Sequence, residues 1–287
     1  MSRGALVEQR VYKLGLNGLN LHVTEWGRAD ASPVVMLHGI RGYSATFDGV
    51  AAALQPEFRV IAYDQRGRGE SDWDPRRDYY TDTYVRDLLG VADALGLDSF
   101  DLLGHSMGGI VAMVFAATYP ARLRRMVIED AGLGAFEASS GAQRIQKELA
   151  ATPTVFANWS EAQEFMRRLR PSVSEEARQQ RLRNMLKQRD DGSFTWRYDH
   201  EGIAATRLHP DPARLVDLAE HVPRITCPTL VIRGGRSDYL QSDMAQRMCA
   251  SNARIQAVEI PDAGHYVHDD QPELFEAQVA SFFRTAN

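Results

Sequence analysis

The chain of 287 residues predicts a doubly wound α/β fold, with a mostly parallel sheet and a helical lid inserted between strands. Short runs that are apolar at consecutive positions recur along the chain, and helical patterns separate them. Such runs suit strands covered on both faces, as in a parallel sheet. Strands that alternate with helices are typical of a doubly wound sheet, and one long charged stretch interrupts this alternation.

The predicted elements follow one another in a regular order. Two halves of a β-hairpin come first, around Asn17-Gly18, a dipeptide that suits a tight turn with positive φ. Buried-strand patterns follow at residues 34–39, 59–64, 100–106, 126–130, 229–234 and 255–260. Helical patterns lie at residues 45–54, 84–95, 107–119, 242–249 and 272–284. We therefore assign residues 1–131 and 223–287 to the two parts of one core domain.

Residues 132–222 break the alternation. This stretch is helical in pattern and heavily charged, without an obvious buried strand. An insertion on the side where the strands end would cover the site there as a lid. A separate all-helical domain is the alternative, but the sheet pattern resumes afterwards and needs its last strands, which favours the lid.

Composition narrows the class of partner and the location. With 33 Lys and Arg against 38 Asp and Glu, the net charge is −5, so we expect no nucleic-acid partner. The two cysteines, Cys227 and Cys249, lie in no metal-binding pattern and are expected to be free thiols. The polar N-terminus is not a secretory signal and no run of about 18 apolar residues occurs, so we expect a cytoplasmic protein without a membrane anchor. We expect a monomer or homodimer that binds a small molecule and uses no cofactor or metal.

The strongest motif is Gly104-His105-Ser106-Met107-Gly108, which lies between a strand pattern and a helix pattern. It fits G-x-S-x-G, where the serine occupies so tight a strand-to-helix turn that its neighbours must lack side chains. The turn exposes the serine hydroxyl above the sheet. Ser106 is thus the candidate nucleophile.

A serine hydroxyl needs a base, and the base needs an orienting acid. His265 follows the last strand pattern and is the candidate base. Asp238 follows the preceding strand pattern and is the preferred acid, in the chain order serine, acid, histidine. Asp130 ends the strand after the nucleophile helix and competes for the same role.

Backbone groups near Ser106 are candidates for an oxyanion hole. The N–H of Met107 lies at a helix N-terminus, and a sharp turn after Gly39 would aim the N–H of Ile40 at the substrate carbonyl. Arg41 directly follows this turn and is the better candidate among the arginines for contacting substrate. Tyr239 could line an apolar part of the pocket or belong to the core.

Two further segments have structural interpretations. The loop at residues 64–71 is polar and rich in glycine and arginine, but its spacing does not fit a phosphate-binding loop. We expect arginine–carboxylate pairs that brace it. His105 is expected to pack under the serine turn.

Together, VVMLHGIRGYSATF, YDQRGRGESD, LLGHSMGG, LVIRGGRSDYL and AGHYVHDDQPELF resemble the α/β-hydrolase superfamily over nearly the whole chain. Similar branches include carboxylesterases, enol-lactonases, carbon–carbon bond hydrolases and cofactor-free haloperoxidases. The resemblance to (acetamidomethylene)succinate hydrolase, an amide-cleaving enzyme, would promote Asp130, because the acid of that branch follows the strand after the nucleophile helix.

The expected activity is hydrolysis of a small-molecule carboxylic ester or lactone through an acyl-enzyme. A carbon–carbon bond hydrolase that acts on vinylogous diketones, or an amide hydrolase, is the alternative among enzymes. A small-molecule receptor that retains the triad is the alternative from another class.

Overall fold

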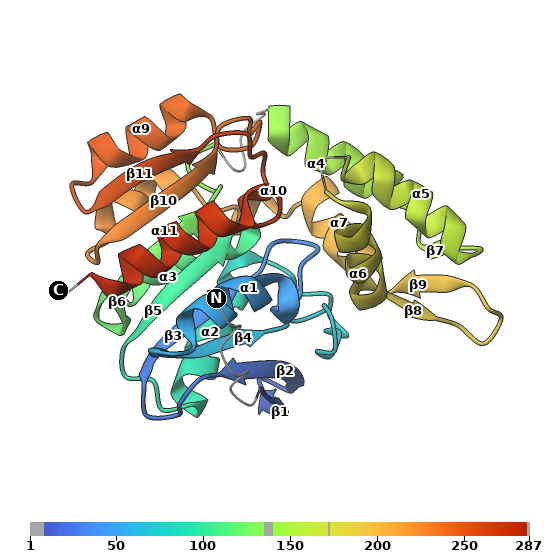
Figure 1. The fold of residues 1–287 in the computed structure, drawn as a ribbon, viewed down its shortest axis with the longest axis horizontal. Coiled ribbons are helices and arrows are strands. Elements are labelled where there is room, and N and C mark those ends of the chain that lie inside the picture. The colour runs from blue at the N-terminus through green and yellow to red at the C-terminus, as the bar shows by residue number, and fades with distance from the viewer. Residues whose placement is uncertain (1–8, 135–139, 172, 286–287) are drawn as a thin grey trace.

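The computed structural model describes residues 9–134, 140–171 and 173–285. Its main sheet has eight strands in the order β1-β2-β4-β3-β5-β6-β10-β11 (Figure 1). These are β1 (Arg10–Leu16), β2 (Leu19–Trp26), β3 (Ser32–Leu37), β4 (Phe58–Tyr63), β5 (Phe100–His105), β6 (Leu123–Glu129), β10 (Thr229–Gly234) and β11 (Ile255–Ile260). β2 pairs antiparallel with β1 and β4, and the pairs from β4 to β11 are parallel. The predicted doubly wound, mostly parallel sheet is therefore confirmed.

The hairpin at the start of the sheet has the predicted turn. Asn17 and Gly18 connect β1 to β2 with φ angles of 50° and 79°. Positive φ at both central positions gives the turn a twist that matches the strands, and asparagine and glycine tolerate it best.

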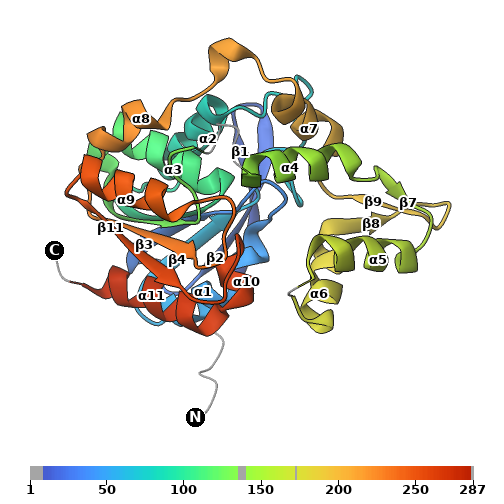
Figure 2. The ribbon, with the colours of Figure 1, turned by 90° about the horizontal axis from the view of Figure 1, so that it is seen from above.

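Helices cover both faces of the sheet (Figure 2). On one face lie α1 (Asp48–Leu54) and α11 (Pro272–Arg284), and on the other α2 (Thr81–Ala94), α3 (Met107–Thr118), α8 (Leu218–His221) and α9 (Ser242–Ser251). Successive strand residues alternate between the two apolar clusters: Val35 and Leu37 join the α3 side, while Val34 and Met36 join the α1 side. Because both faces are buried, the strands are apolar at consecutive positions.

The chain leaves the sheet after β6 and returns to it with β10, and the elements from α4 to α7 extend to one side (Figures 1 and 2). The helices of this segment are α4 (Ser140–Ala151), α5 (Trp159–Leu169), α6 (Glu175–Met185) and α7 (His200–Leu208). It also contains a small antiparallel sheet, β7-β9-β8, that was not predicted. These strands are β7 (Val155–Phe156), β8 (Leu186–Gln188) and β9 (Phe194–Trp196). They are too short to leave a periodic pattern in the sequence.

The segment has apolar packing of its own. The rings of Phe156, Phe165 and Trp196 contact one another, and Trp196 is fully buried. This packing is continuous with that of the core, because Phe156 and Trp196 belong to the same apolar cluster as α3. The chain has rejoined the sheet by α8, which packs directly against α3. The remaining short helices are η1 (Ser44–Phe47), η2 (Pro120–Arg122), η3 (Pro212–Arg214), η4 (Val222–Arg224) and α10 (Val267–Asp270).

Within the described ranges, no helix is long and apolar enough to cross a membrane. Cys227 and Cys249 are both free thiols, as expected.

Candidate active site

Ser106 lies on a strained turn between β5 and α3. Its φ of 52° and ψ of −117° are unusual for a residue with a side chain, and the hydroxyl-bearing residue is only 3% exposed. A Cβ at Gly104 would lie 2.4 Å from the carbonyl oxygen of Gly108, and a Cβ at Gly108 would lie 2.2 Å from that of Leu37. The predicted steric reason for the glycines around the serine therefore holds in the structure.

His265 bridges Ser106 and Asp130. Its Nε2 lies 2.9 Å from Ser106 Oγ, and its Nδ1 lies 2.7 Å from Asp130 Oδ2. Because Asp130 can only accept when ionised, Nδ1 carries the proton and Nε2 is free to accept from the serine hydroxyl. Tyr239 packs on the imidazole, with 4.5 Å between the ring centroids.

The expectation that Asp238 orients His265 is wrong. Asp238 accepts instead from Arg144 of α4, at 2.7 Å from Nε and 2.9 Å from Nη2. Arg144 lowers the pKa of the Asp238 carboxyl. The alternative acid, Asp130, takes the position beside the base.

Two features aim the Asp130 carboxylate at the histidine. Asp130 has a φ of 46° just after β6, which turns its side chain along the strand end. The Ser237 hydroxyl donates to Asp130 Oδ2 at 2.6 Å, and the Gly234 N–H donates to Oδ1 at 3.1 Å. Ser237 thus faces into the sheet edge, while its neighbour Asp238 faces the inserted segment. The sequence did not indicate a role for Ser237. The one signal that could have suggested it is its position next to Asp238.

Burial sets the charge state of the base. Burial, followed by the positive charges of Arg170 and Arg144, lowers the pKa of His265 to about 3. Burial also raises the pKa of Asp130 to about 7, and its hydrogen bonds from Ser237 and Gly234 oppose that rise. At pH 7 the imidazole is therefore neutral and able to accept a proton.

The Gly39–Ile40 peptide is held in one orientation by the partners of its carbonyl. The Gly39 carbonyl accepts from the N–H of Gly42 at 3.0 Å and lies 2.8 Å from His38 Nδ1. In a trans peptide the N–H points opposite to the carbonyl, so the Ile40 N–H points away from these partners. Ile40 and Met107 both line a cavity that contains Ser106.

Arginine–carboxylate pairs brace the loop at residues 64–71, as predicted. Arg66 pairs with Asp87 and Asp74, at 2.5 Å and 2.6 Å. Arg68 is almost fully buried and donates from Nε to the Ile40 carbonyl at 2.9 Å. Arg68 therefore fixes the peptide that follows the candidate oxyanion donor, a role that its spacing alone could not reveal.

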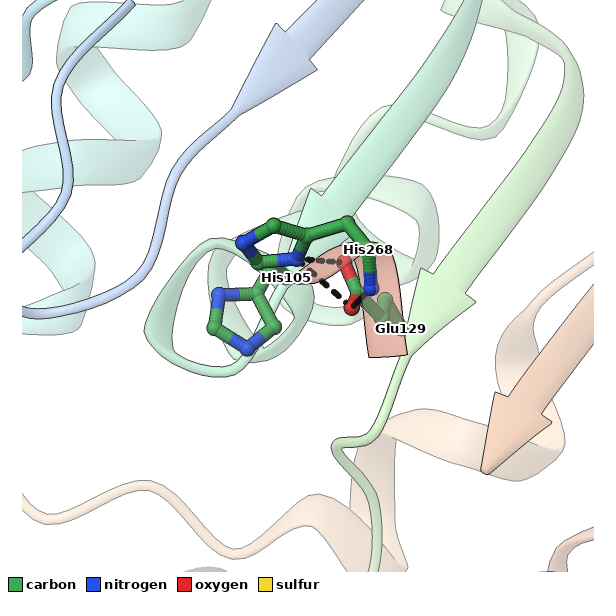
Figure 3. Close-up of side chains that lie close together, drawn as sticks. All are labelled: His105, Glu129 and His268. Carbon is green, nitrogen blue, oxygen red and sulfur yellow. Dashed lines mark hydrogen bonds and ion pairs between the residues drawn. The ribbon is translucent and has the colours of Figure 1, made fainter. Parts of the chain in front are cut away.

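A second histidine–carboxylate pair lies beside the first (Figure 3). Glu129 accepts from the backbone N–H of His268 at 2.9 Å, and its Oε1 lies 2.7 Å from His268 Nδ1. His105 packs under the serine turn, as expected, with its Nε2 3.1 Å from the His265 carbonyl. The adjacent carboxylates of Asp130 and Glu129, at the end of β6, thus each contact one histidine, His265 or His268, of the segment that follows β11.

These three side chains also have the spacing of metal ligands. Among the described residues, His105, Glu129 and His268 form the one such group, with ligand atoms within 4.8 Å of one another. Glu129 and His268 are hydrogen-bonded to each other, and the ring of His105, held by the His265 carbonyl, packs edge-on against His268.

Ser106 lines two cavities. The larger, about 260 Å³, includes Ile110 of α3, Ile145 of α4 and Tyr239 in its lining. The smaller, about 20 Å³, includes Arg41, Arg170 and Arg181. Arg41 and Tyr239 thus line different cavities that share the serine. The sequence alone could not separate Arg170 and Arg181 from the other arginines of the inserted segment, for which a solvated helix surface is at least as good an interpretation as contact with a carboxylate.

The fold and the site together define the class of protein. It is an α/β protein of the hydrolase type, with Ser106 on the tight turn between β5 and α3. Residues 32–272 match the family described as alpha/beta hydrolase fold, and the chain belongs to this family. This membership confirms the resemblance seen in the sequence motifs.

Similar proteins are hydrolases of several kinds. The chain is 30% identical over 269 residues to sn-1-specific diacylglycerol lipase ABHD11 of Mus musculus. The aligned region covers 89% of this chain and 82% of the lipase. It is 29% identical to the 3-hydroxybutyrate-oligomer hydrolase of Cupriavidus necator, over 90% of each chain. Among solved structures, E-2-(acetamidomethylene)succinate hydrolase has a TM-score of 0.85 at 23% identity, covering 97% of this chain and 100% of that one. These names support hydrolase activity in general.

Proposed function

We propose that the protein is a serine hydrolase that cleaves a small-molecule carboxylic ester or lactone through an acyl-enzyme. The observation that carries this proposal is the continuous chain of contacts from Ser106 Oγ through His265 to Asp130, at 2.9 Å and 2.7 Å. These distances are within hydrogen-bonding reach for a nucleophile, its base and an orienting acid.

In the proposed mechanism, His265 Nε2 takes the hydroxyl proton while Ser106 Oγ bonds to the substrate carbonyl carbon. Asp130 stabilises the resulting imidazolium. The tetrahedral intermediate collapses, and the leaving group departs with the proton from His265. Water then attacks the acyl-enzyme with His265 again as base, which regenerates the free serine and releases the acid.

The N–H groups of Ile40 and Met107 are the proposed donors to the oxyanion. Met107 is the first residue of α3, where backbone N–H groups lack partners within the helix. Loss of one such donor typically costs about 2.7–4 kcal/mol of transition-state stabilisation. We also propose that residues 132–222 act as a lid, since Ile145 and Thr206 of this segment line the larger cavity above Ser106.

Amide or carbon–carbon bond cleavage is the second candidate, and the position of Asp130 favours it. In the branch that the sequence resembles, the acid also follows the strand after the nucleophile helix. A relative 24% identical over 273 residues is 2-(acetamidomethylene)succinate hydrolase of Mesorhizobium japonicum. The same triad would serve either bond, so a comparison of esters, lactones, amides and vinylogous diketones separates the candidates.

Labelling and turnover test the proposal. A fluorophosphonate should label the wild-type protein at Ser106 and leave Ser106→Ala unlabelled. Wild-type protein should hydrolyse an aryl ester over many turnovers, and Ser106→Ala should not. Labelling without multiple turnovers would instead favour a receptor that retains the triad. Absence of labelling at Ser106 would overturn the nucleophile assignment.

A further inference from the structure

Three arginines lie beside the candidate nucleophile: Arg41 is buried, and Arg170 and Arg181 are half-buried. Arg41 comes from the turn after β3, Arg170 from the end of α5 and Arg181 from α6. All three line the small cavity that also contains Ser106, and this set is called the arginine pocket below. Side chains from the core and from the inserted segment thus converge there.

The positive charge of this pocket is only partly compensated. Arg41 pairs with Glu148 at 3.1 Å, and Arg181 pairs with Asp269. The Nε atoms of Arg41 and Arg181 are buried and have no hydrogen-bond partner. Arg170 packs on the ring of Tyr266 and forms no ion pair with a carboxylate of the described residues.

Such a concentration of charge is costly without an anion. Burial lowers the pKa of Arg170 to about 10, and the nearby positive charges of Arg181 and Arg41 contribute to this shift. The guanidinium is still charged at pH 7. Buried charges in proteins are usually paired. Arg41 and Arg181 each have one carboxylate partner, whereas Arg170 has none among the described residues, so the pocket holds one positive charge more than these carboxylates balance.

We propose that the arginine pocket binds a carboxylate of the substrate, so that the scissile carbonyl of the same molecule lies on Ser106. This inference rests on the proposed hydrolase function and names its substrate class. Arginine suits the role because its planar group donates two parallel hydrogen bonds to a carboxylate.

The two cavities define the shape of that substrate. Both include Ile40 and Ser106 in their linings, so a bound molecule can extend from the serine into each. The arginine pocket is small, about 20 Å³, where one water needs about 10–15 Å³, so only a small polar group can enter it. The larger cavity, about 260 Å³, takes the other arm. The substrate is therefore a carbonyl compound with a short carboxylate arm and a bulkier, largely apolar arm.

A bound carboxylate would also act on the base. The charge of Arg170 disfavours protonation of His265. An anion on Arg170 offsets that charge and makes His265 a stronger base while the substrate is in place. A neutral substrate of the same shape lacks this effect.

The test uses mono(4-nitrophenyl) glutarate and its neutral methyl ester as matched substrates. Rates are corrected for spontaneous hydrolysis with Ser106→Ala. Wild-type protein should prefer the carboxylate form in kcat/KM, and Arg170→Met should reduce this preference by about 10- to 100-fold. Arg170→Lys should retain part of it. The control Arg168→Met removes an exposed arginine of the same helix and should keep the wild-type preference.

Direct binding gives a readout that is independent of turnover. Glutarate binding to Ser106→Ala, measured by calorimetry, should weaken by a similar factor when Arg170→Met is added. Far-ultraviolet circular dichroism checks that each variant is folded. An unchanged preference and unchanged glutarate binding in folded Arg170→Met would overturn the arginine pocket. Failure of the proposed hydrolase function would give a different result. In that case Ser106→Ala and wild-type protein would hydrolyse the neutral ester at the same rate.

Discussion

Asp130 Oδ2 lies 2.7 Å from His265 Nδ1, although the two residues are 135 positions apart in the chain. Their contact depends on β6 and β10 being parallel neighbours in the sheet, which brings the loops after β6, β10 and β11 to one edge. Ser237, from the loop after β10, donates to the same carboxylate oxygen. All three loops thus contribute to holding the base.

Replacing Asp130 should therefore damage catalysis far more than replacing Asp238. In Asp130→Asn the amide cannot stabilise the imidazolium and can favour the wrong tautomer of His265. We expect kcat to fall by about 10³- to 10⁴-fold. Asp238→Asn loses a partly exposed ion pair with Arg144, and kcat should fall by less than about tenfold. Steady-state kinetics of both variants on one aryl ester decides the matter, and the opposite ranking would reinstate Asp238.

The sheet and the serine turn could be predicted because their causes are local. Strands covered on both faces must be apolar at consecutive positions, and the turn at Ser106 must have small neighbours. The acid could not be chosen in this way. Asp130 and Asp238 both follow strands that end at the same edge, and only side-chain direction separates them. That direction depends on the positive φ of Asp130 and on the contact of Asp238 with Arg144, a residue nearly a hundred positions away.

Distance along the chain also explains why the arginine pocket could not be predicted from the sequence. Arg170 and Arg181 belong to a segment rich in arginine, where most of these side chains form ion pairs on the surface. Their convergence on Ser106 follows from how α5 and α6 pack over the sheet edge. No periodicity in the sequence encodes that arrangement.

Glu129 should matter for stability and for the placement of His265. Its carboxylate is fully buried and accepts from both the backbone N–H and the ring of His268, three residues after the base. Glu129→Ala leaves these donors unsatisfied, so we expect the free energy of unfolding to fall by roughly 1–3 kcal/mol. Urea denaturation measures this loss. Glu273→Ala, at an exposed position of α11, should change stability by less than about 0.5 kcal/mol.

The pH dependence should reveal the charges around the base. Activity requires neutral His265 and is lost as the pH falls through its pKa in the folded protein. Because burial and the charges of Arg170 and Arg144 lower that pKa, protonation of His265 should not reduce kcat/KM as the pH falls through 6.5, the ordinary value for histidine. A loss of kcat/KM near pH 7 would instead report protonation of Asp130, whose pKa burial raises to about 7.

Removing one of these charges should shift the acid limb of the profile in a known direction. Arg144→Met takes away a positive charge and the ion pair that neutralises Asp238, and both changes favour protonated His265. The acid limb of kcat/KM should move to higher pH. Arg183→Met, at an exposed position of α6, should leave the profile where it is. A shift to lower pH in Arg144→Met would contradict the assigned charge effect.

Gly108 tests whether the backbone geometry of the serine turn limits activity. A methyl group at this position would lie 2.2 Å from the Leu37 carbonyl oxygen, so β3 or the start of α3 must move in Gly108→Ala. A displacement of about 1 Å at the nucleophile can lower the rate by about 10²-fold, and overpacking typically costs about 1–3 kcal/mol of stability. Kinetics and thermal unfolding should both register the change. Gly15→Ala offers a matched control, because its nearest neighbouring atom would be 3.9 Å away and its φ is not positive. If the two substitutions reduce kcat equally, close packing at Gly108 is not what holds Ser106 in position.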